Sequence, residues 1–207
     1  MYETLALYID GEFINGDGRK TEEVTNPATL DVLGHLPHAT TADLDRALSA
    51  AARAFETWRT SSPMLRSEIL RKVGQLSRER AQAIGRNMTL DQGKPLAEAV
   101  GEVMGCSDHA DWHAEECRRI YGRVILPRSP EVRQMVLREP IGVCAAFTPW
   151  NFPYNQAIRK VCAAIGAAEL LPDALQAPNV ERDREQRVAD ATEAYKEAEE
   201  LLQNITE

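Results

Sequence analysis

Hydrophobic side chains recur at helical spacing through much of the chain. Apolar positions three and four residues apart predict a helix that begins after Thr40, where Asp43 supplies a capping-box partner. A second helix is expected from Pro63, because proline suits the first helical turn. Asp91–Pro95 interrupts the pattern, and a long helix should follow over about Leu96–Tyr121. The expected buried stripes comprise Leu44, Leu48, Ala51, Phe55 and Trp58, then Leu65, Ile69, Val73 and Leu76.

Other stretches follow the pattern of extended chain. Leu5–Gly16 predicts a hairpin with an Asp10-Gly11 turn, and Thr25–Pro37 predicts a second extended pair hinged around Asn26-Pro27. After the long helix, strands are expected at residues 122–126 and at Val132–Leu137, on either side of a proline-rich turn.

A strand, a tight turn and a helix are expected in succession near residue 150. Ile141–Phe147 is continuously apolar, as is typical of a strand buried on both faces. Pro153 then suits the first turn of a helix over about Tyr154–Ala168. This order is the first half of a βαβ unit, so the α/β fold class is expected. Ligands of such folds lie beside helix N-termini at the carboxyl ends of strands.

Asn151 occupies that turn between two prolines, Pro149 and Pro153, which restrict the backbone on both sides of it. Local physics leaves two roles open for its side chain. It could cap the helix, which is the usual use of asparagine there. Alternatively, a fixed amide donor beside a helix N-terminus could stabilise negative charge on a reacting oxygen.

Charge divides the chain into two regions. Residues 1–168 carry 21 acidic and 20 basic side chains, whereas residues 169–207 carry 11 acidic and 4 basic ones. We therefore expect a body over residues 1–168 and an acidic linker and helix over residues 169–207. Three outcomes are open for the tail: an amphipathic helix packed on the body, a short coiled coil or partner helix, or a poorly ordered segment. Its apolar 3-4-3-4-3 seam comprises Val188, Ala191, Tyr195, Ala198, Leu202 and Ile205.

Composition excludes several classes of function. A net charge of −8 argues against nucleic-acid binding, which needs a basic surface. No apolar run is long enough for a membrane span, and the first residues show no secretory signal. The four cysteines lack the spacing of a disulfide framework, so reduced thiols and a cytoplasmic location are expected.

A possible zinc set on the long helix is rejected on length. Cys106, His109, His113 and Cys117 share one helical face. A helix rises about 16 Å over eleven residues, so the four side chains cannot all reach one ion at about 2.0–2.3 Å. No metal site is expected.

Several motifs together resemble the aldehyde dehydrogenase family. They are YIDGEF, NPATLDVLGHLPHATTADLDRAL, LDQGKPLAEAVGEV, CRRIYGRVI, REPIGVCAA and FTPWNFP, in register over Leu5–Ala168. The resemblance implies the N-terminal part of that fold: hairpins, helices, an oligomerisation arm around Gly122–Pro140 and the first βα unit of an incomplete Rossmann-like sheet. A C-terminal helix would follow.

The resemblance also implies an activity, the oxidation of an aldehyde to a carboxylate with NAD or NADP. In the family a cysteine attacks the aldehyde, and the motif asparagine, here Asn151, helps to hold the oxyanion. Arg159 resembles the arginine of members that act on acid semialdehydes, although an ordinary surface salt bridge is an equal alternative. The residues expected along the cofactor are Phe147, Thr148, Pro149 and Trp150, and those on the substrate side are Phe152 and Arg159.

The resemblance stops after Ala168. Ala174 stands where a cofactor-binding lysine is expected, and the motifs of the general-base glutamate and the nucleophilic cysteine are missing. We therefore expect a truncated oxidoreductase that is inactive alone. Two alternatives are a non-enzymatic partner that docks on a full-length relative through the arm and tail, as a homo- or hetero-oligomer, and a split enzyme completed by a second chain.

Overall fold

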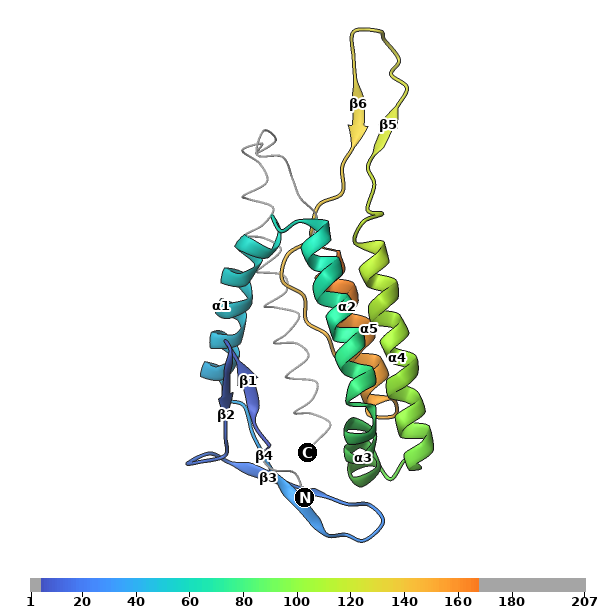
Figure 1. The fold of residues 1–207 in the computed structure, drawn as a ribbon. Coiled ribbons are helices and arrows are strands. Elements are labelled where there is room, and N and C mark those ends of the chain that lie inside the picture. The colour runs from blue at the N-terminus through green and yellow to red at the C-terminus, as the bar shows by residue number, and fades with distance from the viewer. Residues whose placement is uncertain (1–4, 168–207) are drawn as a thin grey trace. The chain divides into compact units, whose positions relative to one another are not determined.

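The computed structural model describes residues 5–167. These residues form five helices and three two-stranded antiparallel sheets (Figure 1). The predicted tail over residues 169–207 lies outside the described residues. The elements in chain order are β1 (Leu7–Ile9), β2 (Glu12–Ile14), β3 (Thr21–Thr25), β4 (Val32–Pro37), α1 (Thr41–Trp58), α2 (Pro63–Glu79), α3 (Ala81–Gln92), α4 (Leu96–Glu116), β5 (Arg123–Ile125), β6 (Gln134–Val136) and α5 (Pro153–Gly166).

The first hairpin confirms its prediction. β1 pairs with β2 through a turn in which Asp10 and Gly11 have φ angles of 55° and 82°. Two successive positive φ angles match the right-handed twist of the strands, which is why Asp-Gly is favoured there.

The second hairpin begins earlier than predicted. β4 occupies the expected region, but its partner β3 starts at Thr21, before the predicted Thr25–Pro37 pair. β3 is mostly exposed and acidic, so it carries no apolar alternation that would have marked it.

The capping box of α1 is confirmed. Thr40 Oγ1 accepts the Asp43 N–H at 3.2 Å, and the Asp43 carboxylate accepts the Thr40 N–H at 2.9 Å. The carboxylate also accepts from Arg19, with Nη2 3.1 Å away. Hydrogen bonds from Arg19, and then from Thr40, hold the pKa of Asp43 well below its usual range.

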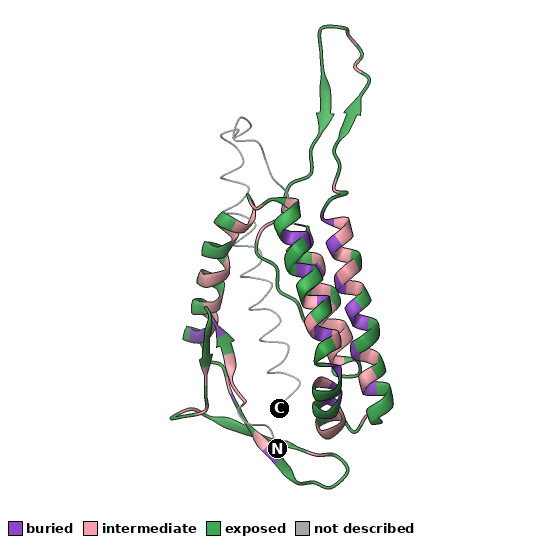
Figure 2. Ribbon diagram, in the orientation of Figure 1, coloured by how far each residue is buried: buried purple, intermediate pink, exposed green. Residues whose placement is uncertain are grey.

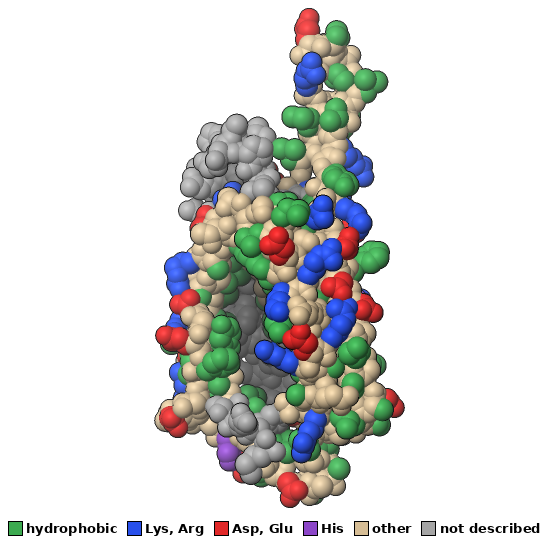
Figure 3. Space-filling model, viewed as in Figure 1, with side chains coloured by type: hydrophobic (Ala, Val, Ile, Leu, Met, Phe, Trp, Pro, Cys, Tyr) green, Lys and Arg blue, Asp and Glu red, His purple; other side chains and the backbone are tan. Residues whose placement is uncertain are grey.

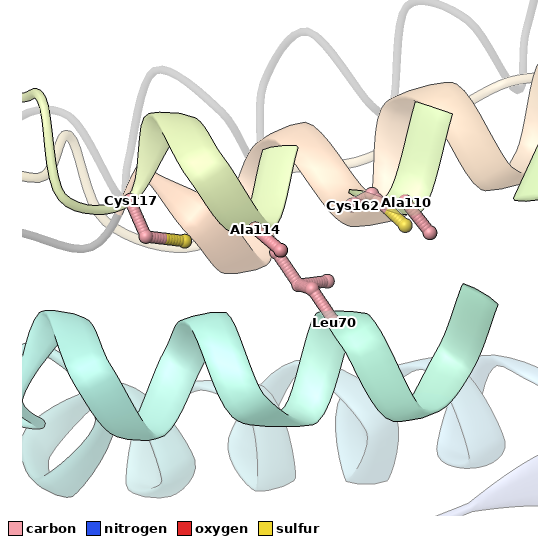
Figure 4. Close-up of a cluster of buried hydrophobic side chains, with 5 residues drawn as sticks. All are labelled: Leu70, Ala110, Ala114, Cys117 and Cys162. Atoms are coloured by element: carbon pink, nitrogen blue, oxygen red, sulfur yellow. The ribbon is translucent and has the colours of Figure 1, made fainter. Parts of the chain in front are cut away.

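Helix α4 is the centre of the helical packing, and α2, α3 and α5 all contact it. Its buried face is built from small side chains: Ala99, Val103, Cys106, Ser107, Ala110 and Ala114. Figure 4 shows Leu70 of α2 pointing toward this face, with Cys162 of α5 beside Ala110. α4 ends at Glu116 rather than at the predicted Tyr121, although the apolar pattern continues past the end of the helix.

Glycines permit the closest approaches to α4. A Cβ atom at Gly85 of α3 would lie 2.6 Å from Val100 Cγ2, and one at Gly166 of α5 would lie 3.3 Å from Cys117 Sγ. A side chain at Gly85 would therefore force α3 and α4 to shift, whereas one at Gly166 would be a tight contact that Cys117 has to relieve by a few tenths of an ångström.

The outer surfaces of α2 and α4 carry interspersed charges of both signs (Figure 3). Arg71 pairs with Glu115 at 2.5 Å, and Arg78 pairs with Asp108 at 3.0 Å and with Asp111. These exposed pairs link the two helices but contribute only modestly to stability.

The arm predicted around residues 122–140 forms the β5–β6 hairpin, and every residue of both strands is exposed (Figure 2). Its tip is the expected proline-rich turn.

The prediction of a strand at Ile141–Phe147 is wrong, because none of these residues belongs to a strand of the described structure. These residues form no ladder with any strand within residues 5–167, and Ile141 and Phe147 are 74% and 65% exposed. An apolar run indicates side chains that favour burial. A strand also needs a neighbouring strand that pairs with its N–H and C=O groups. The helix predicted after it is confirmed as α5, with Pro153 in its first turn.

No helix in residues 5–167 is both long and apolar enough to cross a membrane.

The Asp43 carboxylate predicts a specific acid sensitivity. Because folding lowers its pKa, its contribution to stability is present above the unfolded value of about 3.9 and is lost as pH falls below it. In Asp43→Asn, the free energy of unfolding in urea should be lower near neutral pH and should fall less between about pH 5 and pH 2.

The matched control is Asp45→Asn, an exposed position of the same helix, which should retain the wild-type pH profile. Identical acid profiles for Asp43→Asn and the wild type would contradict the prediction.

Candidate functional site

The candidate site is the turn between residues 147 and 152 together with the start of α5. Phe152 is the N-cap residue, with φ −135° and ψ 69°, and its own side chain makes no capping hydrogen bond. Asn151 is therefore not the N-cap residue of α5, and the capping role considered for it is not observed. Asn151 is exposed and lies one residue before this N-cap, two before the first residue of the helix.

Two side chains from the end of α3 hold the backbone of this turn. Gln92 Nε2 donates to the Trp150 carbonyl at 2.7 Å, and Lys94 Nζ donates to the Asn151 carbonyl at 3.1 Å. Gly93 lies between them with φ 77° and ends α3 in the left-handed conformation. The predicted break at Asp91–Pro95 thus also supplies the contacts that hold the turn. Lys160 of α5 adds a bond to the Phe147 carbonyl.

Lys94 and Glu102 form a largely buried ion pair behind the turn. Their nitrogen and oxygen lie 2.5 Å apart, and the side chains are 12% and 4% exposed. The second oxygen of Glu102 accepts the backbone N–H of Asn155, in the first turn of α5, at 3.0 Å. Lys94 Nζ also lies 4.2 Å from the centroid of the Phe152 ring. The Lys94–Glu102 pair thereby contacts the turn, the Phe152 ring and the first turn of α5.

The sequence reasoning missed this pair, although a signal for it existed. Ala99, Val103 and Cys106 form the buried stripe of α4. Glu102 is three residues after Ala99 and four before Cys106, so it falls on that stripe. A carboxylate on an apolar face needs a partner, which indicates a polar contact with functional or positioning significance.

The residues predicted to lie along a cofactor are all accessible. Phe147 and Trp150 are 65% and 77% exposed, and Thr148 and Pro149 are also exposed. They form an irregular run that leads into the N-terminus of α5.

Of the two residues predicted on the substrate side, Phe152 is brought against Lys94 and Arg159 is not. Arg159 is exposed on α5, about two helical turns beyond Phe152. It takes part in no ion pair with another residue of the described range, so the salt-bridge alternative finds no support there. Burial lowers the pKa of His113, and the charge of Arg159 acts in the same direction.

An open apolar hollow of about 330 Å³ lies where α3 faces the start of α5. It is lined by Met88, Pro153, Tyr154, Ala157, Ile158 and Val161.

Three of the four cysteines are buried. Burial raises the pKa of the Cys106 and Cys162 thiols to about 11 and raises that of Cys117. A nucleophilic cysteine needs the opposite shift, because the thiolate is the attacking form. Cys144 is exposed in the unpaired segment before the turn. Within residues 5–167, no group of three or more His, Cys, Asp or Glu side chains could hold a metal ion.

Comparison with known proteins identifies the class to which this fold belongs. A family model described as "Aldehyde dehydrogenase family" matches residues 13–169. A crystal structure of an NADP-dependent enzyme of Escherichia coli superposes with a TM-score of 0.77 at 40% identity, covering 81% of this chain and 35% of that one. The chain therefore belongs to the aldehyde dehydrogenase family, and its described part has the fold of the N-terminal region, as predicted.

Individual relatives include semialdehyde dehydrogenases. The glutarate-semialdehyde dehydrogenase of Pseudomonas putida is 43% identical over 173 residues, which are 83% of this chain and 36% of that enzyme. The NADP⁺-dependent succinate-semialdehyde dehydrogenase of E. coli is 41% identical over 172 residues, 82% of this chain and 36% of the enzyme. The chain thus spans about a third of the length of these relatives.

The thiol environments predict an ordered reactivity. At about pH 8, a thiol with a pKa of about 11 is ionised in roughly one molecule in a thousand. Iodoacetamide should therefore modify Cys144 first and leave Cys106 and Cys162 largely unmodified in the folded chain, as measured by peptide mass spectrometry.

The urea-unfolded chain is the control, and its four cysteines should react at similar rates. Fast modification of Cys106 or Cys162 in the folded chain would contradict the assignment of these thiols as inert.

Proposed function

We propose that this chain provides the oxyanion side and part of the cofactor side of an active site that oxidises an acid semialdehyde with NAD or NADP. The observation that carries the proposal is the setting of Asn151. Its carboxamide is exposed at the start of α5, and its own backbone carbonyl is held by Lys94.

The Asn151 amide would donate a hydrogen bond to the aldehyde oxygen as negative charge develops on it. A donor whose backbone is already fixed needs little reorganisation when the charge appears, and this is the basis of oxyanion stabilisation. The N-terminus of α5 adds the positive end of the helix dipole nearby.

The exposed run from Phe147 to Trp150 suits a dinucleotide. It offers the Thr148 hydroxyl and two accessible aromatic side chains beside a helix N-terminus. A bound nicotinamide would supply the hydride acceptor, and these residues would orient it. Solved relatives include a 3,6-anhydro-L-galactose dehydrogenase in complex with NAP and a betaine aldehyde dehydrogenase with NAD⁺. Both cofactors are therefore retained in the proposal.

The acid group of the substrate would be bound by Arg159. Several relatives are named for aldehydes that carry an acid group: glutarate semialdehyde, succinate semialdehyde and 3-sulfolactaldehyde. A guanidinium that is exposed and outside the ion pairs of the described residues can bind a carboxylate in a bidentate manner.

The 207-residue chain by itself should not turn over aldehyde. Cys106, Cys117 and Cys162 are buried with raised pKa values, and Cys144 lies exposed in a segment that joins no strand of the described residues. Covalent catalysis therefore requires a nucleophile that residues 5–167 do not provide.

A chimera tests the proposal. Residues 1–167 would replace the matching part of the E. coli succinate-semialdehyde dehydrogenase, with the unfused 207-residue chain as the inactive reference. Asn151→Ala should lower kcat by about 10²- to 10³-fold, the usual effect of removing one oxyanion donor. Arg159→Ala should raise KM for succinate semialdehyde, because the carboxylate contact is lost, while leaving butanal oxidation unchanged.

Arg128→Ala, an exposed residue of the β5–β6 turn, is the matched control and should leave both substrates unaffected. An active chimera whose kcat is unchanged by Asn151→Ala would overturn the oxyanion role. An equal effect of Arg159→Ala on both aldehydes would overturn the substrate class.

The β5–β6 hairpin favours a second candidate function, docking on another chain of the family. Val124 and Leu126 are 87% and 92% exposed, and Met135 on the facing strand is 65% exposed. Hydrophobic side chains gather along the hairpin in Figure 3. A narrow hairpin with apolar side chains and free strand edges is suited to pairing with a second copy.

Sedimentation velocity measures this association. The wild-type chain should sediment as a dimer or larger species, whereas the double variant Val124→Glu and Leu126→Glu should shift toward the monomer, because like charges replace apolar contacts. Arg128→Glu, a charge change in the hairpin turn, should leave the species unchanged. A wild-type chain that is monomeric at all concentrations would contradict the docking function.

A further inference from the structure

The N-cap residue of α5 does not supply the hydrogen bond that usually fixes a helix N-terminus. The first N–H groups of a helix have no partner within it, and a side chain from the N-cap residue normally accepts one. Here the N-cap is Phe152, which has no acceptor in its side chain.

Glu102 supplies that acceptor from another helix. Its Oε1 atom accepts the N–H of Asn155, the third residue of α5, at 3.0 Å. The third N–H is the group that an ordinary N-cap side chain would bind, and a carboxylate there also interacts favourably with the helix dipole. Glu102 thus caps α5 from outside.

Lys94 holds the chain on the other side of the same helix start. Its ammonium donates to the Asn151 carbonyl at 3.1 Å and to Glu102 Oε2 at 2.5 Å. The two anchoring points, Asn151 O and Asn155 N, are four residues apart and enclose the first turn of α5. Neither anchor is independent, because each charged group keeps the other in place.

We propose that Lys94 and Glu102 act as a positioning pair that sets the orientation of the Asn151 carboxamide. The inference rests on the proposed function, since it takes Asn151 as the oxyanion donor. Neither residue touches the reacting atoms. They act on Asn151 through its backbone and through the first turn of the following helix.

Burial of the pair supports this role. The side chains of Lys94 and Glu102 are 12% and 4% exposed, so each would be a nearly buried unpaired charge without the other. Such a pair adds little stability compared with well-packed apolar groups, and its removal one partner at a time is disruptive. Its geometric specificity is the property that an oxyanion site requires, because small displacements of a donor reduce the rate strongly.

Amide hydrogen exchange of the full 207-residue chain, followed by NMR, tests the positioning directly. In Lys94→Gln, the Asn155 amide should exchange at least about tenfold faster, because local opening of the helix start is no longer opposed. The amide of Ala110, in the centre of α4, should keep its wild-type rate. Lys94→Arg keeps the positive charge and offers more donors, so it should restore most of the protection at Asn155.

The matched control is Lys72→Gln, which removes an exposed lysine that bonds Gln75 on α2. It should leave the Asn155 rate unchanged. Lys94→Gln should also add little further acceleration in a Glu102→Gln background, because the two residues act as one unit.

Catalysis in the chimera described above gives the functional readout. Lys94→Gln should lower kcat by about tenfold or more in the presence of Asn151, and by much less in an Asn151→Ala background. A purely structural residue would lower activity equally in both backgrounds.

The outcomes separate the inference from the function on which it rests. Unchanged exchange at Asn155, equal acceleration at Asn155 and Ala110, or failure of Lys94→Arg to rescue would each overturn the positioning pair, whatever Asn151→Ala does. Local acceleration at Asn155 with no effect of Asn151→Ala on kcat would instead overturn the proposed function.

Discussion

The small side chains of α4 are the constraint on which the rest of the helical structure depends. Its buried face consists of alanine, serine, cysteine and one valine, so α2, α3 and α5 can all approach the same helix closely. Packing density inside proteins is high enough that one added methylene group is felt. On the partner helices, Gly85 of α3 and Gly166 of α5 also lack side chains where the helices approach one another closely. Because Lys94 lies two residues after the end of α3 and Asn151 lies just before α5, this close packing brings the candidate site together.

Local sequence signals predicted the local structure well. The Asp10-Gly11 turn, the Thr40–Asp43 capping box and the proline at the start of α5 each specify an element through bonds to near neighbours. β3 was misplaced because its side chains are mostly exposed and carry no apolar period. The apolar run Ile141–Phe147 was predicted to be a buried strand from its composition. Composition does not show whether a neighbouring strand is present to pair with it.

The candidate site was predictable only in part, for a related reason. Asn151 stood out because two prolines flank it, and the family resemblance named the residues around it. The contacts that hold it come from residues 92, 94 and 102, more than forty positions upstream. Such contacts depend on how α3, α4 and α5 pack, which no local pattern describes. The position of Glu102 on an apolar stripe was the one signal that periodicity alone could have supplied.

The exposed segment from Ile141 to Phe147 has a consequence for how this region can be completed. Proline precedes the segment at Pro140 and follows it at Pro149, and none of its residues pairs in a ladder with a strand of residues 5–167. Joining a sheet would fix the φ and ψ angles of these residues as a strand and would cost conformational entropy. A β-strand supplied from elsewhere would offset that cost by pairing with N–H and C=O groups that have no ladder partner among residues 5–167, and by covering the exposed side chains of Ile141 and Phe147.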